Sequence, residues 1–249
     1  MSNIYYSYTA IDGFGSQYQK IIESYISCKY TNKNYAYSPL NNIEHNYNND
    51  VNYATRLENL MNLKENIINI NENMEIRYIN VNDDLYTKNI RIFFSDNIDR
   101  LCESEHMKFI KDCFWANKER DFFKNGKINI AVQIRRENYM DRGLAGERAS
   151  TPNTYYLNIM NQIRKNNGDN LLFHIYSQGD ISQFKELENK DVVFHLNEDI
   201  IETFIGMVAA DKLIISPSSF SYVAALISDG EIYYKPFWHN HRKEWIICG

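Results

Sequence analysis

The sequence predicts an α/β fold with two domains, and two observations lead to this fold class. Apolar runs of strand length alternate with amphipathic helical segments through the second half of the chain, with short connections between them. The first half is less regular but shows the same alternation. Repeated strand, helix, strand units of this size specify a parallel sheet covered on both faces, with ligands at the carboxyl ends of its strands.

The second domain is expected at 127–249. Its predicted strands are the apolar runs at 128–134, 171–176, 192–196, 213–215 and 231–234. Helical faces lie between them, marked by Tyr156 to Ile163, Ile181 to Leu187, Ile200 to Val208 and the segment SFSYVAALIS. Two adjacent arginines, Arg135 and Arg136, follow the first strand and are therefore expected at the carboxyl edge of the sheet.

The first domain is expected at 1–126 and faces the second across a cleft. Its predicted strands are 4–10, 76–81 and 91–94, and its predicted helices follow a glycine loop and the apolar spacing at 57–68 and 98–114. The Asn-rich stretch 32–52 is typical of a long loop, and KNGK, 124–127, marks the boundary between the domains.

Composition narrows the class of function. The chain has 249 residues, 44% of them hydrophobic, which is enough to bury a core, and its net charge of -5 argues against a nucleic-acid partner. The four cysteines form no C-x-x-C pair, and we interpret His239 and His241 as a solvated turn, so no metal site is expected. No apolar stretch reaches the length of a membrane span, and MSNIYYSYTA lacks the features of a secretion signal, so we expect a cytoplasmic protein.

A glycine loop near the N-terminus is the first candidate anion site. Gly13 and Gly15 precede an amphipathic helix, so backbone N–H groups could approach a phosphate or a sugar closely. Tyr18 occupies the third glycine position of the dinucleotide fingerprint and disfavours a nicotinamide or flavin site. The alternative is an ordinary tight turn.

The arginine pair is the second candidate. Two guanidinium groups leaving an apolar strand are costly to desolvate unless an anion meets them, and a phosphate supplies that partner. Adjacent strand residues point to opposite faces, so one arginine faces a ligand while the other is structural. The alternative is a surface pair that forms a salt bridge with Glu137.

The third candidate is the segment SPSSF. A short buried strand stops at Pro217, and Ser218 and Ser219 then open a helix whose free N–H groups and hydroxyls face the same edge of the sheet as the arginines. The alternative is a plain serine N-cap. Two anion sites at the ends of strands of one sheet would together neutralise a diphosphate.

These three segments, DGFGSQYQKI, VQIRRENY and PSSFSYVAAL, carry a family resemblance. Their order resembles that of the α1,2- and α1,6-fucosyltransferase superfamily, which includes the protein O-fucosyltransferases. There a glycine loop precedes H-x-R-R-x-D and a late S-S-F-S-W-W-A-A-W-L. The resemblance implies a GT-B-like pair of Rossmann-type domains, acceptor-side first and donor-binding second. It also implies inverting transfer from GDP-fucose without a metal or other cofactor.

The resemblance implies roles for individual residues. Arg135 would clamp the β-phosphate and stabilise the departing GDP, with Arg136 mainly structural. Gln133 stands where the family has histidine, and Asn138 where it has aspartate, so a donor contact and an orienting carboxylate are changed. The donor-binding residues predicted in this way are Gly13, Gly15, Gln133, Arg135, Asp180, Glu202, Ser218, Ser219 and Phe220.

Two carboxylates complete the expected site. Thr203 aligns with the family's acidic guanine reader, and we choose Glu202 beside it, because a carboxylate accepts from both guanine N1–H and the 2-amino group. Asp141 and Glu147 follow the arginines. Glu147 lies five residues before Pro152, as the presumed base of the α1,6 enzymes lies before its proline, so Glu147 is the expected base. The alternative is a solvated loop carboxylate.

The expected function is therefore inverting transfer of L-fucose from GDP-fucose to a hydroxyl of a glycan acceptor. Two alternatives stay open: a transferase that uses another GDP-sugar, and a catalytically inactive protein of the same fold that binds a sugar nucleotide or a glycan.

Overall fold

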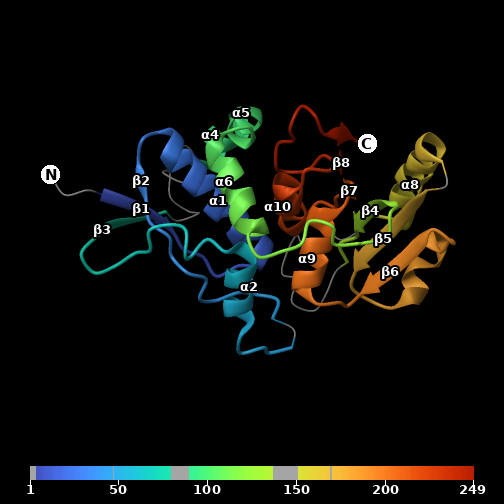
Figure 1. The fold of residues 1–249 in the computed structure, drawn as a ribbon, viewed down its shortest axis with the longest axis horizontal. Helices are drawn as coiled ribbons and strands as arrows, with labels where there is room; N and C mark the ends of the chain where they lie inside the picture. The colour runs from blue at the N-terminus through green and yellow to red at the C-terminus, as the bar shows by residue number, and fades with distance from the viewer. Residues whose placement is uncertain (1–3, 47, 80–89, 137–150, 169) are drawn as a thin grey trace. The chain divides into compact units, whose positions relative to one another are not determined.

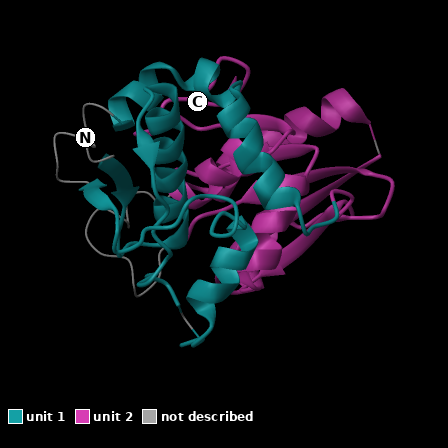
Figure 2. Cartoon of the chain, turned by 60° about the vertical axis from the view of Figure 1, so that its left-hand side comes forward, with its two compact units in different colours: residues 1–119 teal, residues 120–249 magenta. Residues whose placement is uncertain are grey.

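The structure is a computed structural model that describes residues 4–46, 48–79, 90–136, 151–168 and 170–249. The chain divides into two compact units, Met1–Glu119 and Arg120–Gly249, which Figure 2 colours separately. This division precedes the predicted boundary at 126/127. The residues between the two positions pack with the second unit, since the ring of Phe123 lies 4.3 Å from that of His174.

The first unit is built on a three-stranded parallel sheet in the order β2-β1-β3. Its strands are β1 (Ile4–Tyr8), β2 (Asn34–Tyr35) and β3 (Glu75–Ile79), labelled in Figure 1. The long helix α1 (Phe14–Tyr30) follows β1 directly and buries most of its length. The predicted strand, glycine loop and helix at the start of the chain are therefore present.

The other helices of the first unit are α2 (Tyr53–Met61), α4 (Ile92–Asp96), α5 (Ile98–Cys102) and α6 (Glu105–Trp115). The prediction of a strand at 91–94 is wrong, because this run is helical. At the C-terminal end of this helix, the side-chain amide of Asn97 donates to the carbonyl of Phe93 at 2.8 Å. The helix predicted through 68 ends at Met61, where Asn62 adopts φ 53°.

A buried carboxylate holds the loop between β2 and α2. Glu58 of α2 accepts hydrogen bonds from the Tyr37 hydroxyl at 3.0 and 2.9 Å and from the backbone N–H of Leu40 at 2.5 Å. Burial raises the pKa of Glu58, and the hydrogen bonds from Leu40 and Tyr37 oppose that shift. The Glu58 side chain thus helps to fix this part of the Asn-rich stretch, together with Gln17 Nε2, which donates to the carbonyl of Asn42 at 2.8 Å.

The second unit contains a six-stranded parallel sheet in the order β6-β5-β4-β7-β8-β9. Its strands are β4 (Ile128–Gln133), β5 (Leu171–Ser177), β6 (Val192–Leu196), β7 (Lys212–Ile214), β8 (Glu231–Tyr234) and β9 (Ile246–Ile247). The chain builds outward from β4 through β5 to β6, then returns to the other side of β4 as β7. The strand order therefore reverses between β4 and β7, where open α/β sheets bind ligands.

Helices cover both faces of this sheet (Figure 1). On one face α8 (Asn153–Asn167) and the 3-10 helix η2 (Ile181–Leu187) enclose an apolar core with alternate residues of β4 and β5. The other face carries α9 (Ile200–Ala209), whose Gly206 lies against the ring of Tyr176, and α10 (Ser219–Ile227) packs beside α9. The predicted α/β fold class, with a parallel sheet in each unit, is confirmed. In the second unit, the helix predicted at 181–187 is a 3-10 helix.

A chain of hydrogen bonds crosses the sheet beneath α9. The backbone N–H of Lys127 donates to Asn125 Oδ1 at 3.0 Å, which directs the amide nitrogen of Asn125 toward Asn129 Oδ1 at 2.8 Å. Asn129 Nδ2 donates to the Lys127 carbonyl at 2.9 Å. Asn129 Oδ1 is therefore the atom that faces His174 Nε2, 3.1 Å away, and this histidine nitrogen must carry a proton.

The chain of hydrogen bonds continues from His174 to His195 and Glu198. With Nε2 protonated, neutral His174 presents the acceptor Nδ1 to His195 Nε2 at 2.9 Å, so His195 must donate. The other nitrogen of His195 faces the two oxygens of Glu198 at 3.0 and 3.1 Å. Burial, and then the nearby His195, lower the pKa of His174 to about 4.

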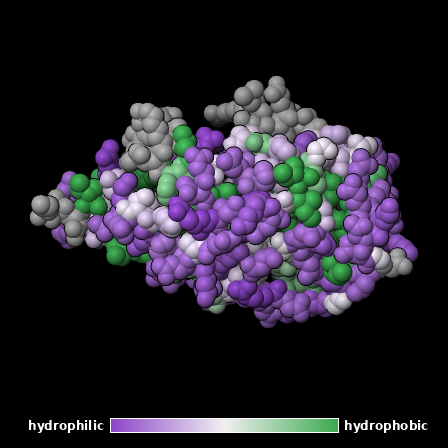
Figure 3. Space-filling view, turned by 90° about the horizontal axis from the view of Figure 1, so that it is seen from above, coloured by the Kyte–Doolittle hydropathy of each residue, from purple (hydrophilic) through white to green (hydrophobic). Residues whose placement is uncertain are grey.

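The surface of the described residues carries both hydrophilic and hydrophobic side chains. The face drawn in Figure 3 is mainly hydrophilic, with apolar residues in separate small groups. Among the described residues, no helix is long and apolar enough to cross a membrane.

Candidate functional site

The carboxyl ends of β4 and β7 form the centre of the candidate site. Gln133, the last residue of β4, is buried, and its Oε1 accepts a hydrogen bond from the hydroxyl of Ser216, just beyond β7. This bond ties together the two strands between which the sheet order reverses. Gln133, predicted as a donor contact, thus has its side-chain oxygen engaged within the sheet.

The backbone that leaves β4 toward Arg135 is firmly held. The N–H of Ile134 donates to the carbonyl of Tyr176 at 3.0 Å, and Ser177 Oγ donates to the carbonyl of Ile134 at 2.8 Å. Arg135 follows at the edge of the sheet with a partly exposed side chain. Its position at the end of a central strand is thus determined by the register of β4 and β5.

Arg136 has contacts of a structural kind. Its guanidinium donates to the carbonyl of Thr151 at 3.2 Å and to Asn153 Oδ1, and it lies over the ring of Phe184, 5.2 Å from the centroid. Burial lowers its pKa. Thr151 also accepts from Lys235 Nζ at 3.1 Å, so the start of α8 is fastened to the ends of β4 and β8.

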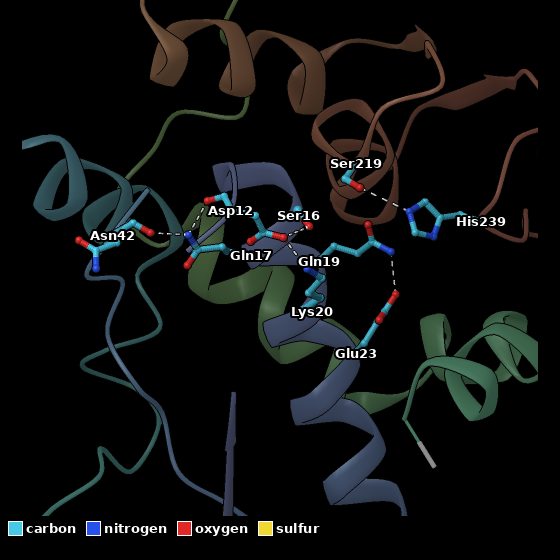
Figure 4. Close-up of polar contacts among 9 residues, drawn as sticks. All are labelled: Asp12, Ser16, Gln17, Gln19, Lys20, Glu23, Asn42, Ser219 and His239. Carbon is cyan, nitrogen blue, oxygen red and sulfur yellow. Dashed lines mark hydrogen bonds and ion pairs between the residues drawn. The ribbon is translucent and has the colours of Figure 1, made fainter. Parts of the chain in front are cut away.

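Three serines at the N-terminus of α10 have different hydrogen-bond partners. Ser218 is the N-cap, and its hydroxyl oxygen accepts from the N–H of Phe220 at 3.2 Å. Ser221 turns back and donates to the carbonyl of Ser216 at 3.0 Å. Ser219 differs, because its Oγ lies 3.4 Å from His239 Nε2 on a separate loop (Figure 4).

His239 is a functional candidate that sequence reasoning missed. The sequence predicts a solvated turn at this position, but the His239 ring stacks on Tyr222 of α10 with centroids 4.7 Å apart and lies 5.2 Å from the Phe237 ring. The aromatic residues at 222, 234, 237 and 245, which contact one another, were the available signal. Trp245 belongs to this buried cluster, whereas Trp238 is 39% exposed.

Asp180 and Glu202 lie after β5 and β6, on one side of β4. Asp180 caps η2 and accepts from the N–H of Ser182 at 2.9 Å; its hydrogen bonds with Ser182 lower its pKa. Glu202 lies in the first turn of α9. Burial, with the charges of Glu198 and Glu202, raises the pKa of the Tyr176 phenol. Phe220 packs on Phe204 of α9, with ring centroids 5.5 Å apart.

The glycine loop belongs to the first unit and already contains an anion. Gly13 is the N-cap of α1, and Gly15 lies in its first turn. Asp12 Oδ2 accepts from Ser16 Oγ at 2.6 Å and forms an ion pair with Lys20 (Figure 4). This carboxylate therefore already occupies the polar groups of Ser16 and Lys20 in the first turns of the helix. A Cβ at Gly13 would come 2.9 Å from the His45 ring, so a larger residue there would require this ring to shift.

The proposed base falls outside the described residues. Glu147, together with Asn138 and Asp141, lies in the segment 137–150. Among the residues that the structure describes, no group of three or more His, Cys, Asp or Glu side chains could hold a metal ion.

Comparisons with known proteins extend the description of the fold. No protein-family model and no curated protein matches the sequence. The structure is similar to that of POFUT1 in complex with GDP, at 9% identity and a TM-score of 0.49, covering 100% of this chain and 99% of that one. A POFUT1 complex with GDP-fucose gives 10% identity and a TM-score of 0.49, with 99% and 98% covered. A mutant of FUT1 from Arabidopsis thaliana in complex with GDP gives 9% and 0.42, with 95% and 71% covered. These similarities concern the course of the chain and do not assign an activity to it.

Proposed function

We propose that the protein is a metal-independent, inverting fucosyltransferase that transfers L-fucose from GDP-fucose to a hydroxyl of a glycan. One observation carries this proposal: Arg135 and the N-terminus of α10 stand at the carboxyl ends of two adjacent strands, β4 and β7, where the sheet order reverses. The choice of fucose and of GDP follows the resemblance of the three sequence segments. The cytoplasmic location is proposed from the sequence alone.

The chemistry needs stabilisation of a departing diphosphate. As the bond between the anomeric carbon and the phosphate oxygen breaks, negative charge develops on the β-phosphate, and the sugar takes on oxocarbenium character. The guanidinium of Arg135 meets that charge with charge-assisted hydrogen bonds, and the N–H groups of α10 add the positive end of a helix. A carboxylate, proposed as Glu147, accepts the proton of the attacking hydroxyl.

The guanine nucleobase is proposed to lie at the carboxyl ends of β5 and β6, beside the proposed phosphate site. Asp180 and Glu202 follow β5 and β6, to one side of the proposed phosphate site. A Glu202 carboxylate would accept from both N1–H and the 2-amino group of guanine, a pair of donors that adenine lacks. GDP is therefore expected to bind more tightly than ADP or UDP.

A calorimetric titration of GDP, UDP and ADP into the whole protein, in chelator, tests the proposal. Arg135→Ala should weaken GDP binding by about 1.5–3 kcal/mol, on the order of 10- to 100-fold. Arg136→Ala is the matched control, since its loss should lower the melting temperature more than the affinity. Absent or unselective binding in the wild type would refute the proposed donor.

A binding protein without catalysis is a second candidate, favoured by Gln133. This residue replaces a titratable histidine, and its oxygen is engaged by Ser216. Metal-free transfer or hydrolysis of GDP-fucose supports the transferase, whereas tight GDP-fucose binding with no turnover supports the binder. Competition with GDP-mannose tests whether another GDP-sugar is the donor.

A further inference from the structure

The loop that follows β8 brings an imidazole to the N-terminus of α10. The chain leaves Tyr234 and runs through Lys235–His241, and His239 Nε2 comes within 3.4 Å of Ser219 Oγ. Ser218 and Ser221 use their hydroxyls within the β7–α10 turn and helix cap, whereas Ser219 meets a ring nitrogen from a different element. The loop is no part of the segments that suggested the function.

The loop is fastened at both sides of His239. The hydroxyl of Tyr234 donates to the carbonyl of His239, and the hydroxyl of Tyr222 donates to the carbonyl of Asn240 at 2.7 Å. The backbone N–H of Phe237 donates to the hydroxyl oxygen of Tyr234 at 3.2 Å. Two tyrosines, one on β8 and one on α10, therefore fix the backbone that carries the imidazole.

The ring itself is also held. It stacks on Tyr222 with planes 26° apart, and Phe237 meets it edge-on at 90°. A side chain fixed in this way has little rotamer freedom left to lose when a ligand binds. His239 is thus preorganised beside Ser219.

We propose that His239 is a positioning residue that orients the Ser219 hydroxyl toward the donor phosphate, an inference that rests on the proposed function. When His239 Nε2–H donates to Ser219 Oγ, the hydroxyl proton of Ser219 points away from the imidazole and is available to a phosphate oxygen. The opposite arrangement, in which Ser219 donates to the imidazole, leaves no hydroxyl proton for an anion. Only the first arrangement serves a phosphate, and the anion itself favours it.

The test is GDP affinity of the whole protein by calorimetry, with three replacements at one position. His239→Phe keeps an aromatic ring on Tyr222 but removes Nε2, and it should weaken GDP binding by about 5- to 10-fold, the value of one neutral hydrogen bond. His239→Gln places an amide nitrogen near the position of Nε2 and should restore most of the affinity. His239→Asn, whose amide corresponds to Nδ1, should not.

A double-mutant cycle separates positioning from packing. In a Ser219→Ala background, His239→Phe should have no further effect, because its action passes through the serine hydroxyl. His241→Phe, whose ring lies 5.3 Å from Tyr234 in the same loop, is the matched control and should bind GDP like the wild type. Thermal melts identify any variant that fails to fold.

The outcomes separate this inference from the proposed function. Equal GDP affinity in wild type and His239→Phe, or additive losses in the double mutant, overturns the inference and leaves the donor proposal intact. If the wild type binds no GDP, both are overturned. The positioning role is supported if His239→Phe lowers GDP affinity, His239→Gln restores it, and His239→Phe has no effect in the Ser219→Ala background.

Discussion

His174 is a buried histidine whose lowered pKa makes the stability of the fold depend on pH. Its Nε2 proton is required by Asn129, and a second proton on Nδ1 would oppose the proton that His195 already directs at it. The lowered pKa, about 4 in the folded chain, means that the unfolded chain binds a proton that the folded one does not between pH 6.5 and 4.

Stability should therefore be complete above pH 6.5 and fall as the pH drops toward 4, by on the order of 3 kcal/mol from this group. Urea unfolding at several pH values measures the slope. His174→Gln, which cannot titrate, should show a shallower slope over the same window, although it is less stable overall. An unchanged slope would remove His174 as the cause.

Gly206 gives a second prediction at this scale. A Cβ there would lie 2.1 Å from the Tyr176 hydroxyl oxygen and 2.7 Å from its ring, at the end of a rigid, buried side chain. Helix propensity alone favours alanine by about 0.5–1 kcal/mol, but overpacking costs about 1–3 kcal/mol, so Gly206→Ala should destabilise.

The Tyr176 hydroxyl has no hydrogen-bond partner among the described residues, so Tyr176→Phe should not destabilise and should recover part of the loss in the double variant. Thermal unfolding of the three variants provides the measurement. A Gly206→Ala protein as stable as the wild type would show that the ring can move aside.

At the scale of elements, one carboxylate joins α2 to the loop after β2. Glu58→Ala leaves the Tyr37 hydroxyl and the Leu40 N–H buried without their acceptor, and it should cost about 2–4 kcal/mol in free energy of unfolding. Glu58→Gln keeps one acceptor oxygen and should cost less. Urea unfolding distinguishes them, and equal costs would mean that charge, not hydrogen bonding, holds the loop.

The sequence predicted the elements of the second unit well because its buried strands are continuous apolar runs bounded by polar turns. It failed at 91–94, because four residues are too few to distinguish the period of a helix from that of a strand. The strand order determines where the candidate site is predicted to lie. The contact of His239 with Ser219 did not, because it depends on how a C-terminal loop packs on α10.

At the scale of the whole molecule, each unit has a sheet and buried residues of its own. Most of the residues proposed to bind the donor belong to Arg120–Gly249, and only Gly13 and Gly15 belong to the first unit. A fragment of Arg120–Gly249 should therefore unfold cooperatively and retain GDP binding that Arg135→Ala weakens as it does in the whole protein. Circular dichroism and calorimetry test this, and a fragment that folds without binding GDP would place essential donor contacts in the first unit.

The strand order β6-β5-β4-β7 has a consequence for how such a protein could diversify. Under the proposed function, the phosphate contacts stand on β4 and β7, tied by Gln133 and Ser216, while the base contacts follow β5 and β6. The loops after β5 and β6 can vary in length and composition without disturbing that tie. A library confined to 178–182 and 197–203 could exchange one nucleobase for another while the chemistry at the diphosphate is inherited unchanged.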